Sequence, residues 1–364
     1  MANNFDFGRV VYFPLIRVRQ AEMQGVEMLS DAIKNIILPM FTLGKWRNAD
    51  GIDKGLERIE KALGGRPYML DLSKESSHQN NFILTLLDSD SNFKNWTDFI
   101  SKSEHILPVV QITAEASTRN VVRQGLALES AGRQPIFRIR DYKRDTDAVI
   151  ASLTAMDAPE RSLVIIDAGY LRELSTLRIK PGVVQSVLNS ISRINEEVET
   201  QIVVAGTSYP RAVTDFLERG DNSSGRIDMI EWDLFGELSD YVLYGDHAGV
   251  HSVVYDDAGG TFLPKLDYPK DQFWHFERRP DIRNAEGFAD AARGLLERFP
   301  EIANDQCWGA RMIHRTAVPN GETTINAPAT ALAVRVNLHI SHQARYLSEY
   351  YYELEDEDED REWD

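Results

Sequence analysis

The sequence lacks the features that mark secreted and membrane proteins. It contains one cysteine, Cys307, in 364 residues, so it cannot form an internal disulfide. The N-terminus has no basic segment followed by an apolar one, and no apolar run is long enough to cross a bilayer. These absences predict a cytoplasmic protein without a membrane partner, and they predict that Cys307 is a small buried residue.

Common catalytic signatures are missing as well. The sequence contains no P-loop, no GxSxG nucleophile elbow, no HExxH zinc motif and no CxxC pair. The sequence therefore assigns no reaction, and whether the protein is an enzyme stays open at this point.

Negative charge is concentrated at the C-terminal end. The formal net charge is −17, but the last twelve residues hold nine acids and one arginine, which leaves −9 for the other 352 residues. Because a general duplex-DNA binder carries a basic face, we do not expect this activity. Residues 353–364 are predicted to be a disordered, solvated tail.

Eight short apolar runs, each ending in a polar residue and a turn, dominate the first 250 residues. Most are followed by a helix-type pattern, as in strands of a parallel sheet that is covered on its faces. The runs begin near residues 10, 36, 67, 106, 135, 162, 201 and 241. Their number and order predict an α/β fold, a (β/α)8 TIM-like barrel over residues 1–250. An open doubly wound parallel sheet is the alternative, since the sequence does not show whether the first and last strands pair.

The alternation stops after residue 250. Residues 251–352, which contain two amphipathic helix patterns, are predicted to be a C-terminal extension packed on the barrel. His339 and His342 lie three apart, hence on one face of a helix, and without a third ligand in view they predict packing and hydrogen bonding instead of a metal site.

Polar residues at the strand ends are the candidate site, because barrel proteins bind ligands at the carboxyl end of their strands. Arg138 and Arg140 lie two apart and so share a face of one strand. Together with Arg17 they exceed the charge that one acid would neutralise, which predicts an anionic ligand. Candidate ligand-binding residues are Arg17, Arg138, Arg140, Ser208, Arg211 and Glu231.

Three carboxylates, Asp71, Asp167 and Asp246, are the candidate catalytic residues. Convergent carboxylates hold hard cations such as Mg²⁺, and metal-assisted phosphoester hydrolysis is the reaction they would support. The alternative is that they cap helices or pair with neighbouring arginines. Ser208 and Arg211 similarly read either as an anion site at a helix start or as a plain helix cap. Glu231, next to Trp232, reads either as a general base or as an exposed acid.

The order of several short motifs resembles the "beta protein" family named after a bacteriophage T4 product. These are "YFPLIRVRQAE" from Tyr12, "ILPMFTL", "GTSYPR", the Glu231–Trp232 pair, "YGD" ending at Asp246, "CWGARMIHR" and "RVNLHIS". The resemblance implies a barrel-like α/β fold and a phage or mobile-element setting beside bacterial defence genes, and it implies no reaction. Thr42, His247 and Ala310 depart from the family pattern, which argues against a metal at those positions.

Two functions follow as hypotheses. The first is a protein of phage–host conflict that binds a nucleotide, a phosphorylated small molecule or a nucleic-acid end at the barrel mouth. The second is a non-enzymatic interaction protein that contacts a protein partner from the same operon through its C-terminal extension and tail.

Truncation after residue 352 is expected to leave the melting temperature unchanged. Nine acids in twelve positions repel one another and bury no apolar surface. Differential scanning calorimetry of the full chain and the truncated chain tests this, and a fall of several degrees would contradict it.

Overall fold

The computed structural model describes residues 5–46, 51–173, 175–253 and 263–361. By contact, the chain divides into two compact units, each made of three segments. The first consists of Met1–Arg19, Leu38–Thr207 and Ile230–His247, and the second of Gln20–Ile37, Ser208–Met229 and Ala248–Asp364. Residues 20–37 and 208–229, which the sequence analysis placed in the barrel, thus cluster with the C-terminal part.

The first unit is a ring of eight parallel strands. Their order is β4-β3-β2-β1-β9-β7-β6-β5, and a parallel bridge from Val109 to Ile136 connects the two ends. The first strand pairs with both the second and the last, which confirms the barrel over the open sheet. The strands are β1 (Phe13–Arg17), β2 (Met40–Leu43), β3 (Tyr68–Leu72), β4 (Ile106–Pro108), β5 (Ile136–Ile139), β6 (Leu163–Tyr170), β7 (Gln201–Thr207) and β9 (Leu243–Asp246).

Alternate residues of these strands form the apolar interior of the barrel. One buried cluster takes Phe13 and Leu15 from β1, Met40 from β2, Met69 from β3 and equivalent residues from the other strands. Because side chains alternate across a strand, this cluster identifies which positions on every strand face inward. Phe7, in a 3₁₀ turn before β1, belongs to the same cluster.

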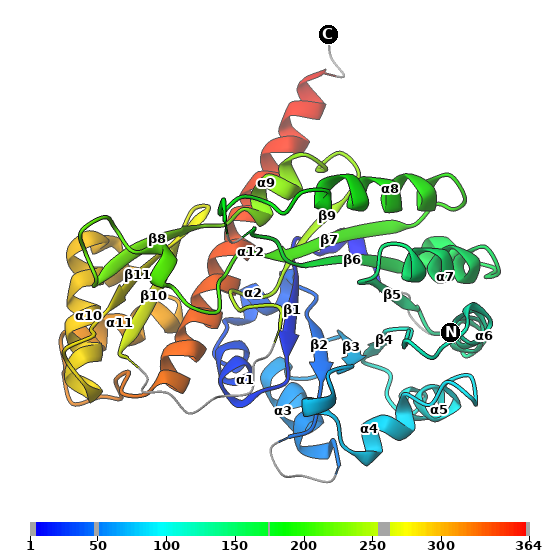
Figure 1. Ribbon diagram of the computed structural model, residues 1–364, viewed down its shortest axis with the longest axis horizontal. Helices are drawn as coiled ribbons and strands as arrows, with labels where there is room; N and C mark the ends of the chain where they lie inside the picture. The colour runs from blue at the N-terminus through cyan, green and yellow to red at the C-terminus, as the bar shows by residue number, and fades with distance from the viewer. Residues whose placement is uncertain (1–4, 47–50, 174, 254–262, 362–364) are drawn as a thin grey trace. The chain divides into compact units, whose positions relative to one another are not determined.

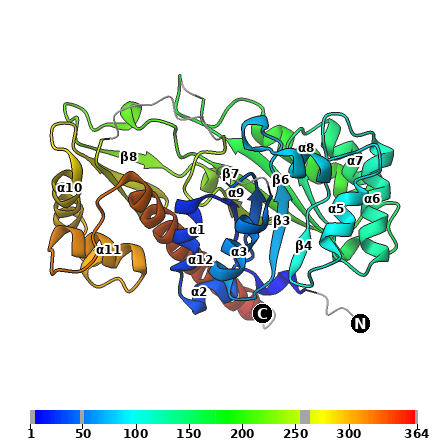
Figure 2. The ribbon, with the colours of Figure 1, turned by 90° about the horizontal axis from the view of Figure 1, so that it is seen from below.

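Helices lie outside the strands of this unit, as Figures 1 and 2 show from two directions. Their ends follow local sequence signals: a capping box of Ser117 and Asn120 begins α6, and Gly64, in the left-handed conformation, ends α3. The helices are α3 (Asp53–Leu63), α4 (Asn81–Leu86), α5 (Lys94–Ile100), α6 (Thr118–Ser130), α7 (Arg144–Leu153), α8 (Val183–Asn195) and α9 (Glu231–Gly236).

The second unit combines a small antiparallel sheet with helices. The sheet order is β10-β11-β8, and the helix nearest the N-terminus, α1, packs on the last one, α12. Gly25 permits this contact, since a Cβ there would lie 2.7 Å from the carbonyl oxygen of Ala333. The elements are α1 (Gln20–Glu27), α2 (Asp31–Ile36), β8 (Ser224–Asp228), β10 (Lys265–Lys270), β11 (Phe273–Arg278), α10 (Asn284–Arg298), α11 (Trp308–Ala317) and α12 (Pro328–Arg361).

Two segments differ from the sequence-based prediction. The helix predicted after β7 is wrong, because residues 208–223 contain only a 3₁₀ turn, Thr214–Phe216, before the chain enters β8. Leu217 bridges to Gly225, so pairing with the small sheet overrides the local helix pattern. Helix α12 continues to Arg361, where the sequence analysis predicted a disordered tail; residues 362–364 lie outside the described part. Among the described residues, no helix is both long and apolar enough to span a membrane.

Replacement of Gly245 by alanine is expected to destabilise the barrel by about 1–3 kcal/mol, the usual cost of overpacking. The added Cβ would lie 2.9 Å from both the Phe13 carbonyl oxygen and a Val203 methyl, where β9 closes the ring. Gly236→Ala is the control, because its Cβ meets no atom within 4 Å. Urea unfolding of both variants tests this, and equal midpoints would contradict it.

Candidate functional site

The carboxyl end of the barrel interior is polar. Side chains alternate along each strand, so the apolar cluster also identifies the next inward-facing positions toward the carboxyl end. These positions are Arg17, Thr42, Asp71, Arg138, Asp167 and His247. The register places three of them side by side, with Arg17 opposite Thr42 and Thr42 opposite Asp71. The sequence thus stacks a charged layer on an apolar one inside the same ring.

Arg138, on β5, is the centre of this layer. Its Nη2 donates to Oδ2 of Asp167 at 2.6 Å, its Nε donates to the same oxygen at 3.1 Å, and its Nη1 donates to Oδ2 of Asp71 at 2.8 Å. Nη1 also lies 3.3 Å from the Thr42 hydroxyl oxygen. One buried guanidinium therefore connects carboxylates from β3 and β6 with a hydroxyl from β2.

The second oxygen of Asp167 binds groups on the other side. Its Oδ1 lies 2.8 Å from Nε2 of His247 and accepts the Gly169 amide at 2.9 Å. Burial alone would raise the pKa of this carboxyl, but the His247 imidazole and the Arg138 guanidinium hold it well below its usual range. Asp167 is thus an ionised carboxylate fixed on both oxygens.

Asp71 is held in the same way. Its Oδ1 accepts from Lys74 and from the Leu72 amide, while Oδ2 takes the bond from Arg138. Burial opposes ionisation, but Lys74 and Arg138 together lower the pKa of Asp71 to about 2. Burial in turn lowers the pKa of Lys74.

A cavity of about 570 Å³ opens beside this layer. Four cationic side chains line it, from the ends of β3 and β5 and the start of α7. They are Lys74, Arg138, Arg140 and Arg144. Arg140 is 42% exposed and its Nε lies 3.7 Å from Asp167, so it connects the buried layer with solvent. The hydroxyl oxygen of Thr113, also in the lining, is buried and has no hydrogen-bond partner within the described residues.

Asp246 and Glu231 lie in a different environment from the Arg138 layer. Asp246 accepts from the Tyr12 hydroxyl and, at 3.2 Å, from the Tyr244 hydroxyl. Trp232 stacks on Tyr244 with ring centroids 4.4 Å apart. Glu231, the residue before Trp232, is also buried. Asp246 and His247 are consecutive residues, so their side chains point to opposite faces of the strand. His247 therefore belongs to the interior layer and Asp246 does not.

The remaining predicted residues are placed as follows. Arg17 ends β1 and is partly buried. Ser208 is fully buried and Arg211 is exposed; both belong to the second unit, in a segment without the predicted helix start. The candidate site residues predicted from the sequence did not include His247, Lys74, Arg144 or Thr113. Strand parity identifies His247 only once the inward-facing positions of β9 are known, and the other three are loop or helix-start residues without a periodic signal.

A family model for the "Beta protein" family matches residues 12–345. A relative, Protein beta of Enterobacteria phage P4, is 37% identical over 358 residues, which cover 97% of this chain and 98% of that protein. The chain belongs to the Beta protein family. The phage of the matched Beta protein is P4, which corrects the T4 of the sequence analysis.

Two solved structures align only weakly with this Beta protein family member. Tryptophan synthase from M. tuberculosis aligns with a TM-score of 0.35 and 11% identity, over 67% of this chain and 83% of that one. A FabK variant from Thermotoga maritima aligns with a TM-score of 0.34 and 10% identity, over 94% and 96%.

Several residues that carried the Beta protein resemblance gather at the joint of β1 and β9. Tyr12 precedes β1, and Tyr244 and Asp246 belong to β9, where Pro14 pairs with Asp246 in register. Burial, with the nearby Asp246 and Glu231 carboxylates, raises the pKa of the Tyr12 hydroxyl, so this group stays a hydrogen-bond donor. These motif residues hold the two strands that close the ring.

Replacing Arg138 with methionine is expected to destabilise the barrel by about 3–5 kcal/mol at pH 7, because two buried carboxylates lose their shared cation. In the native protein both carboxyls have lowered pKa values, so their stabilisation is present above about pH 4 and declines as pH falls toward 2. In the variant, each acid keeps its other cationic neighbour but loses Arg138, and protonation of the acids relieves part of the cost.

The difference between native protein and variant is therefore expected to shrink between pH 7 and pH 4, as measured by urea unfolding at both values. Arg193→Met is the control, since the pair of Arg193 with Asp147 is 46% and 53% exposed. It is expected to change stability by less than about 1 kcal/mol. A pH-independent difference for Arg138→Met would contradict the ionised pairing.

Proposed function

We propose that the barrel unit binds an anionic, phosphate-bearing ligand in the cavity lined by Lys74, Arg138, Arg140 and Arg144. A nucleotide, a phosphorylated small molecule or a nucleic-acid end has the required chemistry. The kinship with a phage protein supports a role in phage–host conflict. The observation that carries the proposal is the cluster of cations around a cavity at the carboxyl end of the strands.

Charge balance supports an anion. Lys74, Arg138 and Arg140 are three cations within ion-pair distance of only two carboxylates, Asp71 and Asp167. The cavity lining also holds Glu115, Asp141 and Asp145, so its four cations exceed its acids by one. A phosphate in the cavity could accept paired N–H donors from a guanidinium. The partnerless Thr113 hydroxyl offers a further donor at the same wall.

The two acids are proposed to orient Arg138. They hold its guanidinium from opposite sides, which fixes the direction in which its remaining edge points. Arg138 already neutralises both Oδ2 atoms, so a divalent cation would have to displace it. For this reason we propose binding as the role of the layer and assign no hydrolysis to Asp71 or Asp167. Asp246 accepts from Tyr12 and Tyr244 outside this layer, and we assign no hydrolysis to it either.

The mutual pairing of Arg138, Asp71 and Asp167 favours a second candidate, a non-enzymatic interaction protein. In that case the charged layer is a structural part of the barrel, and a protein partner binds elsewhere. The two candidates differ in whether the exposed cations of the cavity matter for ligand binding.

The test uses the exposed cations, because Arg140 and Arg144 are 42% and 46% exposed and their loss leaves the buried network in place. Binding of ATP, pyrophosphate and a 5′-phosphorylated single-stranded oligonucleotide is measured by isothermal titration calorimetry at low salt. The double variant Arg140→Ala, Arg144→Ala is expected to bind at least about tenfold more weakly than the native protein, since each charge-assisted bond contributes about 1.5 kcal/mol or more.

Arg193→Ala is the matched control, because Arg193 is as exposed as Arg144 and also pairs with an aspartate on a barrel helix. It is expected to bind like the native protein. If the double variant matches the control, or if the native protein binds none of the three probes, the anion-binding proposal fails and the interaction protein is the better hypothesis.

A further inference from the structure

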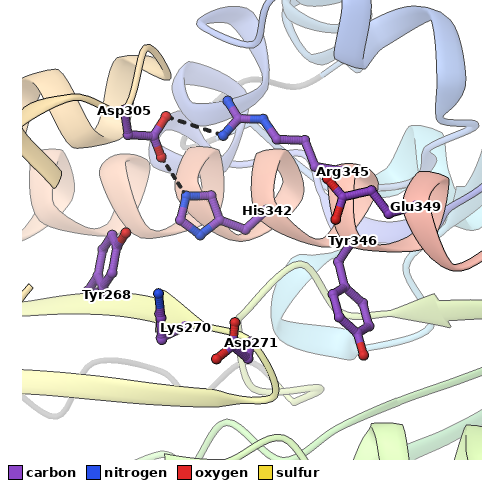
Figure 3. Close-up of a pocket in the computed structure, with 8 residues that line it drawn as sticks. All are labelled: Tyr268, Lys270, Asp271, Asp305, His342, Arg345, Tyr346 and Glu349. Carbon is purple, nitrogen blue, oxygen red and sulfur yellow. Dashed lines mark hydrogen bonds and ion pairs between the residues drawn. The ribbon is translucent and has the colours of Figure 1, made fainter. Parts of the chain in front are cut away.

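The second unit contains a cluster of three potential metal ligands of different kinds. Asp305 precedes α11, Cys307 caps its N-terminus, and His342 lies on α12. A carboxylate oxygen, the sulfur and a ring nitrogen all lie within 4.8 Å of one another. Asp305 and His342 also line a cavity of about 220 Å³, shown in Figure 3. His339, three residues before His342 on α12, packs on Trp274 with ring centroids 4.8 Å apart and is not part of this cluster.

Each of the three side chains has its other polar contacts already fixed. His342 places Nδ1 3.0 Å from the Pro269 carbonyl oxygen, which can only accept, so Nδ1 carries the proton. Nε2 lies 2.8 Å from Oδ2 of Asp305, so without a metal this contact is a hydrogen bond from Nε2, which a bound ion would replace. An imidazole that donates one N–H to a backbone carbonyl and directs its other nitrogen at a ligand cluster has the arrangement of metal-binding histidines.

Asp305 is anchored through its other oxygen. Oδ1 accepts the Cys307 amide at 2.9 Å and lies 3.2 Å from Nη1 of Arg345. Figure 3 shows His342 and Arg345 reaching from α12 toward this carboxylate. The neighbouring cations, His342 above all, hold the pKa of Asp305 below its usual range against the effect of burial. Oδ2 is therefore a charged acceptor directed at the cluster.

Cys307 completes the set at a helix start. Its sulfur accepts the Ala310 amide at 3.4 Å, and the partial positive charge of a helix N-terminus favours a thiolate. Without a metal, burial raises the pKa of the thiol to about 12, so the group stays protonated. A bound cation would replace that proton, which would leave to solvent.

We infer that Asp305, Cys307 and His342 form a binding site for a transition-metal ion, with Zn²⁺ as the best match. One oxygen, one sulfur and one nitrogen ligand suit Zn²⁺ and do not suit Mg²⁺ or Ca²⁺. Zinc bonds of about 2.0–2.3 Å place tetrahedral ligand atoms about 3.5 Å apart, so small side-chain rotations bring the cluster to that geometry. The adjoining cavity leaves a fourth position for water or a ligand.

A metal ion would have to replace the contact between His342 Nε2 and Asp305 Oδ2, whereas the other neighbouring charges contact different atoms. Lys270 pairs with Glu301 at 2.9 Å, and Arg345 contacts Oδ1 of Asp305, the oxygen that faces away from His342. The inference is independent of the anion site, because every residue involved belongs to the second unit.

The test is a Co²⁺ titration of the untagged full chain, followed by absorption spectroscopy. Because Cys307 is the one cysteine in the sequence, a thiolate-to-cobalt charge-transfer band would report on this residue alone. We expect the band to saturate at one equivalent and to disappear when Zn²⁺ is added. Cys307→Ser is expected to abolish the band and to fold normally, since serine is a preferred helix cap.

His342→Gln and Asp305→Asn are expected to weaken Co²⁺ binding at least about tenfold. His314→Gln is the matched control on α11, and it is expected to bind like the native protein. Absence of the band in the native protein overturns the inference and leaves His342 and Asp305 as an ion pair. A band that persists unchanged in His342→Gln and Asp305→Asn overturns it as well, because Cys307 would then bind cobalt without the proposed partners.

Discussion

The barrel depends on one buried guanidinium. Arg138 lies in the last interior layer, where burial would make an isolated charge costly, and two ionised carboxylates from β3 and β6 neutralise it. Those carboxylates are in turn held by Lys74, His247 and backbone amides. The network connects β3, β5 and β6 across the junction of β4 and β5, where a single bridge connects the two ends of the strand order. Charge pairing therefore stabilises closure in this layer, and apolar packing does so in the layer below.

The same network explains why the cavity beside it is basic. A ring interior that ends in an apolar layer would offer an anion no hydrogen-bond donors, whereas this one ends in a layer that contains the guanidinium of Arg138. The exposed cations Arg140 and Arg144 follow β5 directly, so the chain that leaves the buried layer lines the cavity wall. The arginine that forms the buried ion pairs and the arginines that line the cavity are therefore close in sequence, on β5 and at the start of α7.

The barrel strands were predictable because each is a short apolar run, and all eight begin within a few residues of their expected positions. Arg138 with Asp167 was predictable for the same reason, since strand periodicity fixes which side chains share a face. Asp246 and His247 required the correct parity, which the apolar neighbours of β9 determine only once the barrel interior is known. Cys307 and His342 could not be connected, because their contact depends on the packing of α11 on α12 and carries no periodic signal.

The packing of α1 on α12 affects how the chain folds during synthesis. The barrel has all its strands once residue 247 has left the ribosome, but α1 waits for a partner more than 300 residues further along. Until then the carbonyl oxygen of Gly25 lacks Asn337, the residue that donates a hydrogen bond to it in the folded protein. The packing face of α1 thus stays uncovered until α12 has been synthesised, a state that exposes apolar surface in the nascent chain.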